Sequence, residues 1–159
     1  MSYQAVILTV SDSCAAGTRT DTSGPAIRAM LENAGFAVQA MQTVPDEEGQ
    51  ISAAIVHACD ILQADLVVTT GGTGLSARDV TPEATLAVLD REIRAIPVAM
   101  WVEGLKSTPR AMLSRAVAGI RGHTLVLNVP GSEKAARENL GAVVATLDHA
   151  LRMLAGGGR

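Results

Sequence analysis

Residues 5–10 read Ala5-Val6-Ile7-Leu8-Thr9-Val10, and the polar loop Ser11-Asp12-Ser13 follows them directly. An apolar run of this kind predicts a strand that is covered on both of its faces. Strands covered on both faces are typical of parallel sheets that carry helices on each side. This stretch therefore predicts an α/β fold, with a polar loop at the carboxyl end of its first strand.

Helical stripes of apolar residues alternate with further strand-like runs along the rest of the chain. One stripe lies in residues 27–34 and is followed by Gly35, a natural helix stop. Further strands are predicted at residues 36–44, 66–68 and 124–129. Further helices are predicted from the apolar positions of residues 51–62, from residues 97–107, and from the segment that begins near Ser132 and ends near residue 154.

Another helix is predicted to begin at Thr81-Pro82-Glu83. Thr81 would be its N-cap, Pro82 would take the first helical position, and Glu83 would place an acid in the first turn. The apolar residues that continue its face are Leu86, Leu89, Ile93 and Ile96. The pattern therefore predicts a helix that runs through these positions.

The chain has 159 residues, enough for one domain with a sizeable core and too few for two ordinary domains. Strand starts recur about 30 residues apart in the first half, which is the length of a β-α-β unit. We expect a three-layer α/β/α domain over residues 1–155, built around a mainly parallel sheet with a small antiparallel part. Residues 156–159, Gly-Gly-Gly-Arg, are expected to form a flexible tail.

Composition excludes several classes of protein. Hydrophobic residues make up 48% of the chain and the net charge is −3, so disorder is excluded. Aromatic residues make up 2%, which argues against a nucleic-acid groove that stacks bases on aromatic rings. The sequence shows neither a signal peptide nor an apolar run long enough to cross a membrane, so a cytoplasmic protein is expected. Cys14 and Cys59 lie far apart and predict neither a disulfide nor a zinc site.

The chemistry is expected in the loops that follow the strands, because ligands of open α/β sheets bind at the carboxyl ends of the strands. These loops contain glycine, hydroxyl and aspartate residues. They are Ser11-Asp12-Ser13 with residues 17–25, Pro45-Asp46-Glu47, residues 69–79, and Pro130-Gly131-Ser132.

The loop Thr70-Gly71-Gly72-Thr73-Gly74 is the most distinctive of these segments. Its glycines allow close approach of the backbone and can form a nest of N–H groups for a phosphate, although the same residues also suit a plain strand-to-helix turn. A P-loop is excluded because no lysine follows. A dinucleotide site is disfavoured because the loop follows the third strand and Asp79 delays the helix. Pro130-Gly131-Ser132 is a second candidate anion site, or a simple serine cap, at the start of the last helix.

Three aspartates are candidate ligands for a divalent cation. Asp79 either interacts with a helix dipole or holds Mg²⁺ beside phosphates, and Asp46 either caps a helix or faces the same crevice. Asp12 is the third candidate. Acids around a phosphate nest require a cation, since they would otherwise repel the ligand. The cations nearest these loops are Arg19, Arg78, Arg115 and Lys134, which balance charge there or lie on the solvated surface.

Taken together, these loops resemble the MogA/MoaB family of molybdenum-cofactor biosynthesis proteins, which is related to the G domains of gephyrin-type proteins. The resemblance covers residues 5–154. The motifs that carry it are Thr9-Val10-Ser11-Asp12-Ser13, Asp21-Thr22-Ser23-Gly24-Pro25, Pro45-Asp46-Glu47, Thr70-Gly71-Gly72-Thr73-Gly74, Arg78-Asp79-Val80-Thr81-Pro82-Glu83-Ala84-Thr85, Leu113-Ser114-Arg115-Ala116 and Pro130-Gly131-Ser132.

The resemblance implies a molybdopterin adenylyltransferase that transfers AMP from Mg·ATP to the terminal phosphate of molybdopterin and releases pyrophosphate. It implies Asp46 and Asp79 as catalytic residues and as Mg²⁺ ligands. It further implies a trimer or hexamer and a hand-over of product to a molybdenum-insertion protein. The substrate-binding residues that it implies are Ser11, Asp12, Ser13, Thr70, Gly71, Gly72, Thr73, Gly74, Ser114, Pro130, Gly131 and Ser132.

Two alternatives stay open at this point. The first is a protein that binds molybdopterin or scaffolds other proteins without catalysis. The second is another enzyme of similar fold, such as a molybdenum-insertion protein or a CinA-type hydrolase. Those enzymes usually show Asp-Asp after the glycine loop, where this chain has Arg78-Asp79. The Pro-Gly-Ser turn departs from the Pro-Gly-Asn or Pro-Gly-Gln of many relatives and lies closer to the MoaB side of the family.

Overall fold

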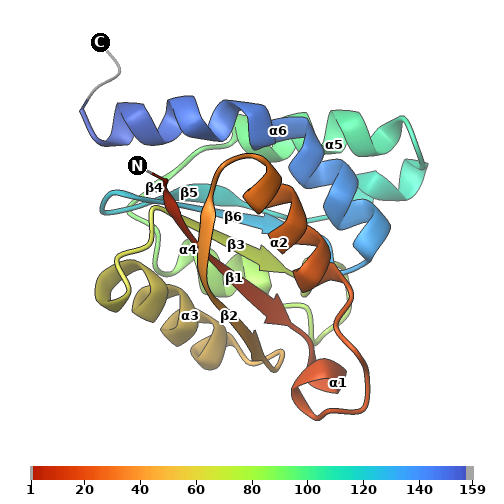
Figure 1. The fold of residues 1–159 in the computed structure, drawn as a ribbon. Helices are drawn as coiled ribbons and strands as arrows, with labels where there is room; N and C mark the ends of the chain where they lie inside the picture. Colours follow the sequence, from red (N-terminus) through yellow and green to blue (C-terminus); the bar gives the residue numbers. More distant parts are fainter. Residues whose placement is uncertain (1, 157–159) are drawn as a thin grey trace.

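A computed structural model describes residues 2–156 of the chain. The predicted flexible tail therefore lies outside the described residues, apart from Gly156. Six strands form one sheet in the order β2-β1-β3-β6-β5-β4 (Figure 1). The strands are β1 (Gln4–Val10), β2 (Ala37–Val44), β3 (Leu66–Thr70), β4 (Arg91–Glu92), β5 (Ala118–Arg121) and β6 (Thr124–Val129).

The sheet is mainly parallel. β1 pairs in parallel with β2 and β3, and β3 pairs in parallel with β6. The hairpin of β5 and β6 and the short pairing of β4 with β5 are antiparallel. The predicted three-layer fold with a small antiparallel part is confirmed.

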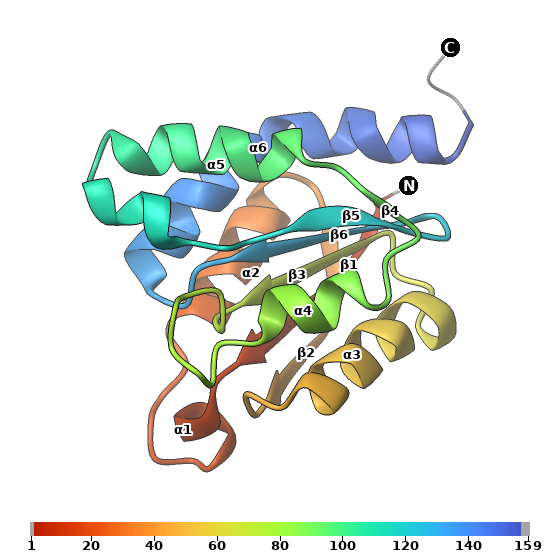
Figure 2. The ribbon, with the colours of Figure 1, turned by 180° about the vertical axis from the view of Figure 1, so that it is seen from behind.

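Helices cover both faces of the sheet (Figures 1 and 2). Side chains of α2, α5 and α6 pack into the core cluster on one face, and those of α3 and α4 pack into the cluster on the other. The helices are α1 (Asp12–Ala15), α2 (Ser23–Asn33), α3 (Glu48–Val56), α4 (Thr81–Leu86), α5 (Ala95–Leu105) and α6 (Glu133–Leu154), with a π-helical turn at His57–Ile61 and a 3-10 turn at Pro109–Leu113.

The alternation of β1 between the two faces explains its apolar sequence. Ala5 and Ile7 belong to one core cluster, whereas Val6, Leu8 and Val10 belong to the other. Each face of the strand is therefore buried under helices, as a parallel central strand requires. Cys59 lies in the second cluster, where burial raises the pKa of its thiol to about 11.

The predicted helix from residue 81 through residue 96 is wrong in two respects. Its N-cap is Val80 rather than Thr81, and it ends at Leu86. The chain then turns to pair β4 with β5, and the backbone N–H of Ile93 donates to Ala118. Leu89 packs on one face of the sheet and Ile93 on the other, so the two residues do not share a helix face despite their helix-like spacing.

The apolar positions of residues 51–62 do not all share one buried face. Ile51 and Ile55 are fully buried in α3, but Leu62 is 36% exposed. The π-helical turn at His57–Ile61 adds a residue to the turn and shifts the helical phase before Leu62. Within residues 2–156, the structure contains no helix whose length and apolar character would let it cross a membrane.

Candidate functional site

Two cavities lie at the carboxyl ends of the parallel strands, on the side of the sheet to which the arrowheads of β1 and β3 point (Figure 1). The smaller cavity, of about 340 Å³, begins where β1 and β3 end, at Val10 and Thr70. In the sheet order β2-β1-β3, the second strand lies on one side of β1 and the third strand lies on the other side. The gap between β1 and β3 is therefore a topological switch point, the usual ligand site of open α/β sheets. The larger cavity, of about 870 Å³, lies between the glycine loop, the 3-10 turn and the start of α6.

The two cavities meet at a junction that both of them share. The residues common to their linings are Gly72, Asp79, Gly131 and Ser132. Within residues 2–156, neither cavity is lined by an aromatic ring. A flat ligand at this site would therefore contact glycine backbone and small side chains, as the scarcity of aromatic residues predicts.

The glycine loop needs its glycines for shape. Gly71 and Gly72 have φ angles of +103° and +70°, which L side chains rarely adopt. A Cβ at Gly71 would collide with the carbonyl oxygen of Val10. A Cβ at Gly131 would lie 3.2 Å from the Cα of Gly71, so the Pro130-Gly131-Ser132 turn packs against the same loop.

Buried hydrogen bonds hold the glycine loop to α4. The hydroxyl of Thr81 donates to the carbonyl of Gly71 at 2.9 Å, and the backbone N–H of Thr81 donates to Gly72 at 3.1 Å. Thr81 therefore acts inside the first turn of the helix, where it ties the helix to the loop. This internal bond replaces the N-cap role that the sequence predicts.

Arg115 also holds the glycine loop in place. Its guanidinium donates to the carbonyl oxygens of Gly74 at 2.8 Å and Asp79 at 2.7 Å, and it forms an ion pair with Glu83 at 2.6 Å. That ion pair holds the pKa of Glu83 below its usual value. Arg115 thus stabilises the glycine loop and α4. The sequence alone allowed either a charge-balancing role or a place on the solvated surface for this residue.

Asp79 lies at the junction of the two cavities. Its Oδ2 accepts a hydrogen bond from the backbone N–H of Ser76 at 3.0 Å. A Cβ on Gly74 would lie 2.9 Å from that oxygen, so the carboxylate packs directly against the glycine loop. Val80 separates Asp79 from the helix, so Asp79 is not the N-cap of α4.

Asp46 reaches the smaller cavity from the end of β2. Its Oδ2 accepts from the backbone N–H of Asp12 at 2.9 Å, and a Cβ on Gly72 would lie 3.2 Å from its Oδ1. Burial raises the pKa of Asp46 above the ordinary 3.8, and the nearby charges of Asp12 and Asp79 act in the same direction. Of the two predicted alternatives for Asp46, the structure places it in the crevice, because the N-cap of α3 is Glu47.

Asp12, Ser11 and Ser13 take different places from one another. Ser11 lines the smaller cavity and caps the short α1 by accepting from the backbone N–H of Cys14. Ser13 contacts Ser11 through its hydroxyl at 3.2 Å. Asp12 forms an ion pair with Arg78 at 3.0 Å and lies outside the linings of both cavities in the described part of the chain.

The remaining predicted site residues lie at the cavities. Thr73 and Ser114 line the larger cavity, and Thr70 lines the smaller one. The hydroxyl of Thr70 donates to the carbonyl of Pro130 at 2.8 Å, which ties β3 to the turn before α6. Ser132 accepts from the backbone N–H of Ala135, so it caps α6 and also faces both cavities.

The structure adds residues that the sequence did not assign to the site. Asp21 lines the smaller cavity and accepts from the hydroxyl of Thr9 at 2.7 Å and from the backbone N–H of Gly24 at 3.0 Å. These bonds fix the start of α2 beside β1. The Asp-Thr-Ser-Gly-Pro motif, which begins with Asp21, was the sequence signal that could have identified this residue. Arg110 and Asn139 line the larger cavity, and no motif distinguished them.

Asp79 at the junction and Asp46 in the adjoining smaller cavity are the candidate ligands for a divalent cation. Within the described residues, the structure has no group of three or more histidine, cysteine or acidic side chains that would form a protein-only metal cage. Mg²⁺ is usually held by one or two carboxylates together with substrate phosphates, and Asp46 and Asp79 can supply oxygen ligands of that kind.

Comparison with known proteins indicates the family to which this chain is similar. Residues 6–149 match the family model described as a probable molybdopterin binding domain. A molybdopterin adenylyltransferase of Helicobacter pylori is 38% identical over 154 residues, which cover 94% of this chain and 86% of that protein. Gephyrin of Dictyostelium discoideum is 41% identical, but the matched part spans only 22% of its length.

Solved structures give the same result. The crystal structure of the molybdopterin biosynthesis enzyme MoaB from Thermus thermophilus superimposes with a TM-score of 0.92 and is 49% identical, with 97% of each chain covered. The resemblance to the MogA/MoaB proteins that the loop motifs indicate is thereby confirmed. On the match over residues 6–149, the chain belongs to the family of the probable molybdopterin binding domain.

Proposed function

We propose that this chain, with residues 1–155 as one domain, is a molybdopterin adenylyltransferase of molybdenum cofactor biosynthesis. The observation that carries the proposal is the junction of the two cavities, where Gly72, Asp79, Gly131 and Ser132 are shared. A reaction that joins two substrates needs two binding spaces whose reacting ends meet. Curated relatives that share 38–42% identity over most of this chain are named molybdopterin adenylyltransferases.

In the proposed reaction an oxygen of the terminal phosphate of molybdopterin attacks the α-phosphorus of ATP. The bond from that phosphorus to the pyrophosphate oxygen breaks, and pyrophosphate leaves. The chain's part is to position the substrates and to balance charge, because such a displacement needs little acid–base chemistry. Backbone N–H groups of residues 72–74 and the N-terminus of α6 at Ser132 would hold the phosphates.

Mg²⁺ is the divalent ion that we propose for this site. Asp46 and Asp79 each use Oδ2 to accept a backbone N–H, which leaves Oδ1 to serve as a ligand. A bound ion would neutralise the charge of the two phosphate-bearing substrates. Arg19, in the lining of the smaller cavity, would add a positive charge there.

Incubation of the purified protein with molybdopterin, ATP and Mg²⁺ tests the proposal. We expect adenylated molybdopterin and an equal amount of pyrophosphate, and loss of both products when EDTA is added. Binding of molybdopterin without pyrophosphate release would instead support the alternative of a non-catalytic binding or scaffolding protein.

We further propose that the chain forms a trimer, or a hexamer of two such trimers, works in the cytoplasm where ATP is made available, and passes its product to a molybdenum-insertion protein. An apolar stripe on α5 supports self-association: Val98, Val102 and Leu105 are 48%, 58% and 45% exposed. A helix that is apolar on its outer face as well as its inner face is usually buried in an assembly.

A further inference from the structure

We infer that Arg78, acting through Asp12, is a positioning residue that fixes the carboxylate of Asp46 in the smaller cavity. The kinetic consequence of this inference rests on the proposed function, whereas its structural consequence does not. Three loops take part, and they follow three different strands. Asp12 follows β1, Asp46 follows β2, and Arg78 belongs to the loop that follows β3.

Asp12 and Asp46 are joined by two reciprocal hydrogen bonds. The backbone N–H of Asp12 donates to Oδ2 of Asp46 at 2.9 Å, and the backbone N–H of Asp46 donates to Oδ1 of Asp12 at 2.9 Å. Each carboxylate thus binds the backbone of the other residue, which fixes both side-chain rotamers. Two carboxylates so close together also repel each other, and this repulsion contributes to the raised pKa of Asp46.

Arg78 supplies the charge that makes this arrangement stable. Its Nε lies 3.0 Å from Oδ2 of Asp12, its Nη2 lies 3.0 Å from Oδ1 of Asp12, and the same Nη2 lies 2.9 Å from Oε1 of Glu47. The fork therefore holds Asp12 with two parallel bonds, a geometry that lysine cannot reproduce. The pKa of Asp12 is lowered mainly by these bonds.

These contacts assign Arg78 a role different from phosphate binding. Its guanidinium is committed to two acids, and in the described part of the chain it lies outside the linings of both cavities. Asp12 likewise faces Arg78 and the backbone of Asp46 rather than the junction. The predicted substrate contact of Asp12 is thus replaced by an indirect role through Asp46.

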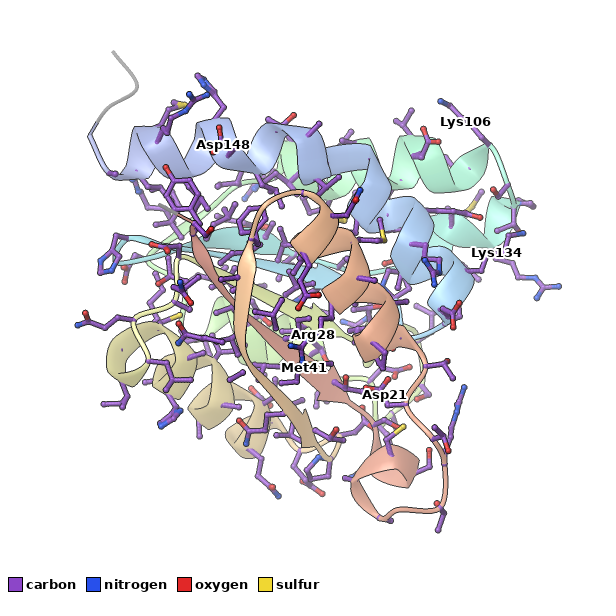
Figure 3. The ribbon with its side chains drawn as sticks, in the orientation of Figure 1. Asp21, Arg28, Met41, Lys106, Lys134 and Asp148 are labelled. Carbon is purple, nitrogen blue, oxygen red and sulfur yellow. The ribbon has the colours of Figure 1, made fainter. Side chains whose placement is uncertain are left out.

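Amide hydrogen exchange tests the structural part without any substrate. In Arg78→Gln we expect the backbone amides of Asp12 and Asp46 to exchange at least about tenfold faster, since each depends on a carboxylate that Arg78 restrains. Arg28→Gln is the matched control. Arg28 forms a similar exposed ion pair, with Glu32 at 2.8 Å, and Figure 3 shows it on α2 beside Met41. Unchanged exchange at Asp12 and Asp46 in Arg78→Gln would overturn the inference.

Adenylation kinetics test the functional part. Arg78→Gln should lower kcat by about ten- to a hundredfold, the usual cost of losing a residue that orients a ligand, with little change in KM for molybdopterin. Asp12→Asn should act similarly, and the double variant should lose no more than either single variant, because both changes break one link. Arg78→Lys should recover only part of kcat.

The alternative role gives a different pattern. If Arg78 bound ATP phosphates directly, KM for ATP would rise in Arg78→Gln and the two losses would multiply in the double variant, which would overturn the inference. If the wild-type protein transferred no AMP, the proposed function would fail. The exchange experiment would then decide the positioning role by itself.

Discussion

At the scale of single residues, the charged side chains of this site differ in whether they face a cavity or are paired with other groups of the protein. Asp79 and Asp46 face the junction or the smaller cavity, whereas Arg78 and Arg115 are paired with acids and backbone carbonyls. The arginines that line the cavities are Arg19 in the smaller one and Arg110 in the larger one. Under the proposed function, a divalent ion at Asp46 and Asp79 would offset the repulsion between these carboxylates and a phosphate-bearing ligand.

Asp79→Ala should lower AMP transfer at least about a hundredfold, the scale of losing one electrostatic contributor, while the fold is kept. Asp148→Ala is a matched control, because Asp148 lies on α6 (Figure 3), paired with Arg152. Steady-state rates of pyrophosphate release and circular dichroism of both variants provide the measurement. Near-normal transfer by the Asp79 variant would remove Asp79 from the catalytic residues.

Asp46→Asn should weaken the use of Mg·ATP, retain molybdopterin binding and leave the melting temperature at pH 7 equal to or above that of the wild type. Because the folded state raises the pKa of Asp46, ionisation of this group costs stability as the pH rises above about 4. The gain in Tm of the variant over the wild type should therefore grow from pH 4 to pH 7.

Thermal melts of the wild type and the variant from pH 4 to pH 7 measure the change in stability. Rates of pyrophosphate release at varied Mg·ATP measure the change in activity. A lower Tm of Asp46→Asn at pH 7 would contradict the assigned cause of the shift.

At the scale of elements, the glycine loop and α4 form one unit with β6. Asn128 of β6 is fully buried, and its side-chain amide donates to the hydroxyls of Thr69 at 2.8 Å and Thr85 at 3.1 Å. Thr85 in turn donates to the carbonyl of Thr81, the residue that holds Gly71. A chain of buried polar contacts thus connects the middle of the sheet to the loop.

Gly72→Ala should destabilise the protein by at least about 1 kcal/mol and abolish most activity, because the φ of +70° is unfavourable for alanine and the new Cβ would collide with the Thr81 hydroxyl. Gly49→Ala is the control. A Cβ at Gly49 in α3 meets nothing within 4 Å, so stability should stay unchanged or rise by less than about 1 kcal/mol. Urea unfolding of both variants decides whether the loop tolerates a side chain.

The sequence predicted the elements whose burial pattern is simple and missed those set by distant contacts. The unbroken apolar run of β1, the stop at Gly35 and the serine cap of α6 are local signals, and the structure confirms them. The end of α4 at Leu86 depends on the pairing of β4 with β5, which residue spacing does not show. Motifs located the site loops, but the Arg78–Asp12 pair joins residues 66 positions apart.

At the scale of the whole molecule, helix α5 has an apolar side that no other element covers in the described residues. α5 packs against α6 and, through Met100, into the core on the sheet, while Val98, Val102 and Leu105 form its exposed stripe. Figure 2 shows α5 along the upper border of the molecule, beside α6 and above β5. In the proposed trimer, copies of the chain would meet at this border.

Val102→Glu should therefore convert the proposed trimer to monomers, because a charge would be buried in the interface. Met153→Glu is the matched control, since Met153 on α6 is 56% exposed and lies outside the stripe. Light scattering after size-exclusion chromatography gives the mass of each variant. Equal oligomeric mass for the two variants would exclude the α5 stripe as the interface.

The shared border of the two cavities bears on how long the product stays bound. In the proposed reaction each cavity would first hold a separate ligand that can dissociate alone, and the product would join the two halves covalently across Gly72 and Gly131. A ligand with two joined halves binds more tightly than either half, because release of one half leaves it next to its vacated space. Slow dissociation would then favour transfer of the reactive product directly to the next protein rather than into bulk solvent.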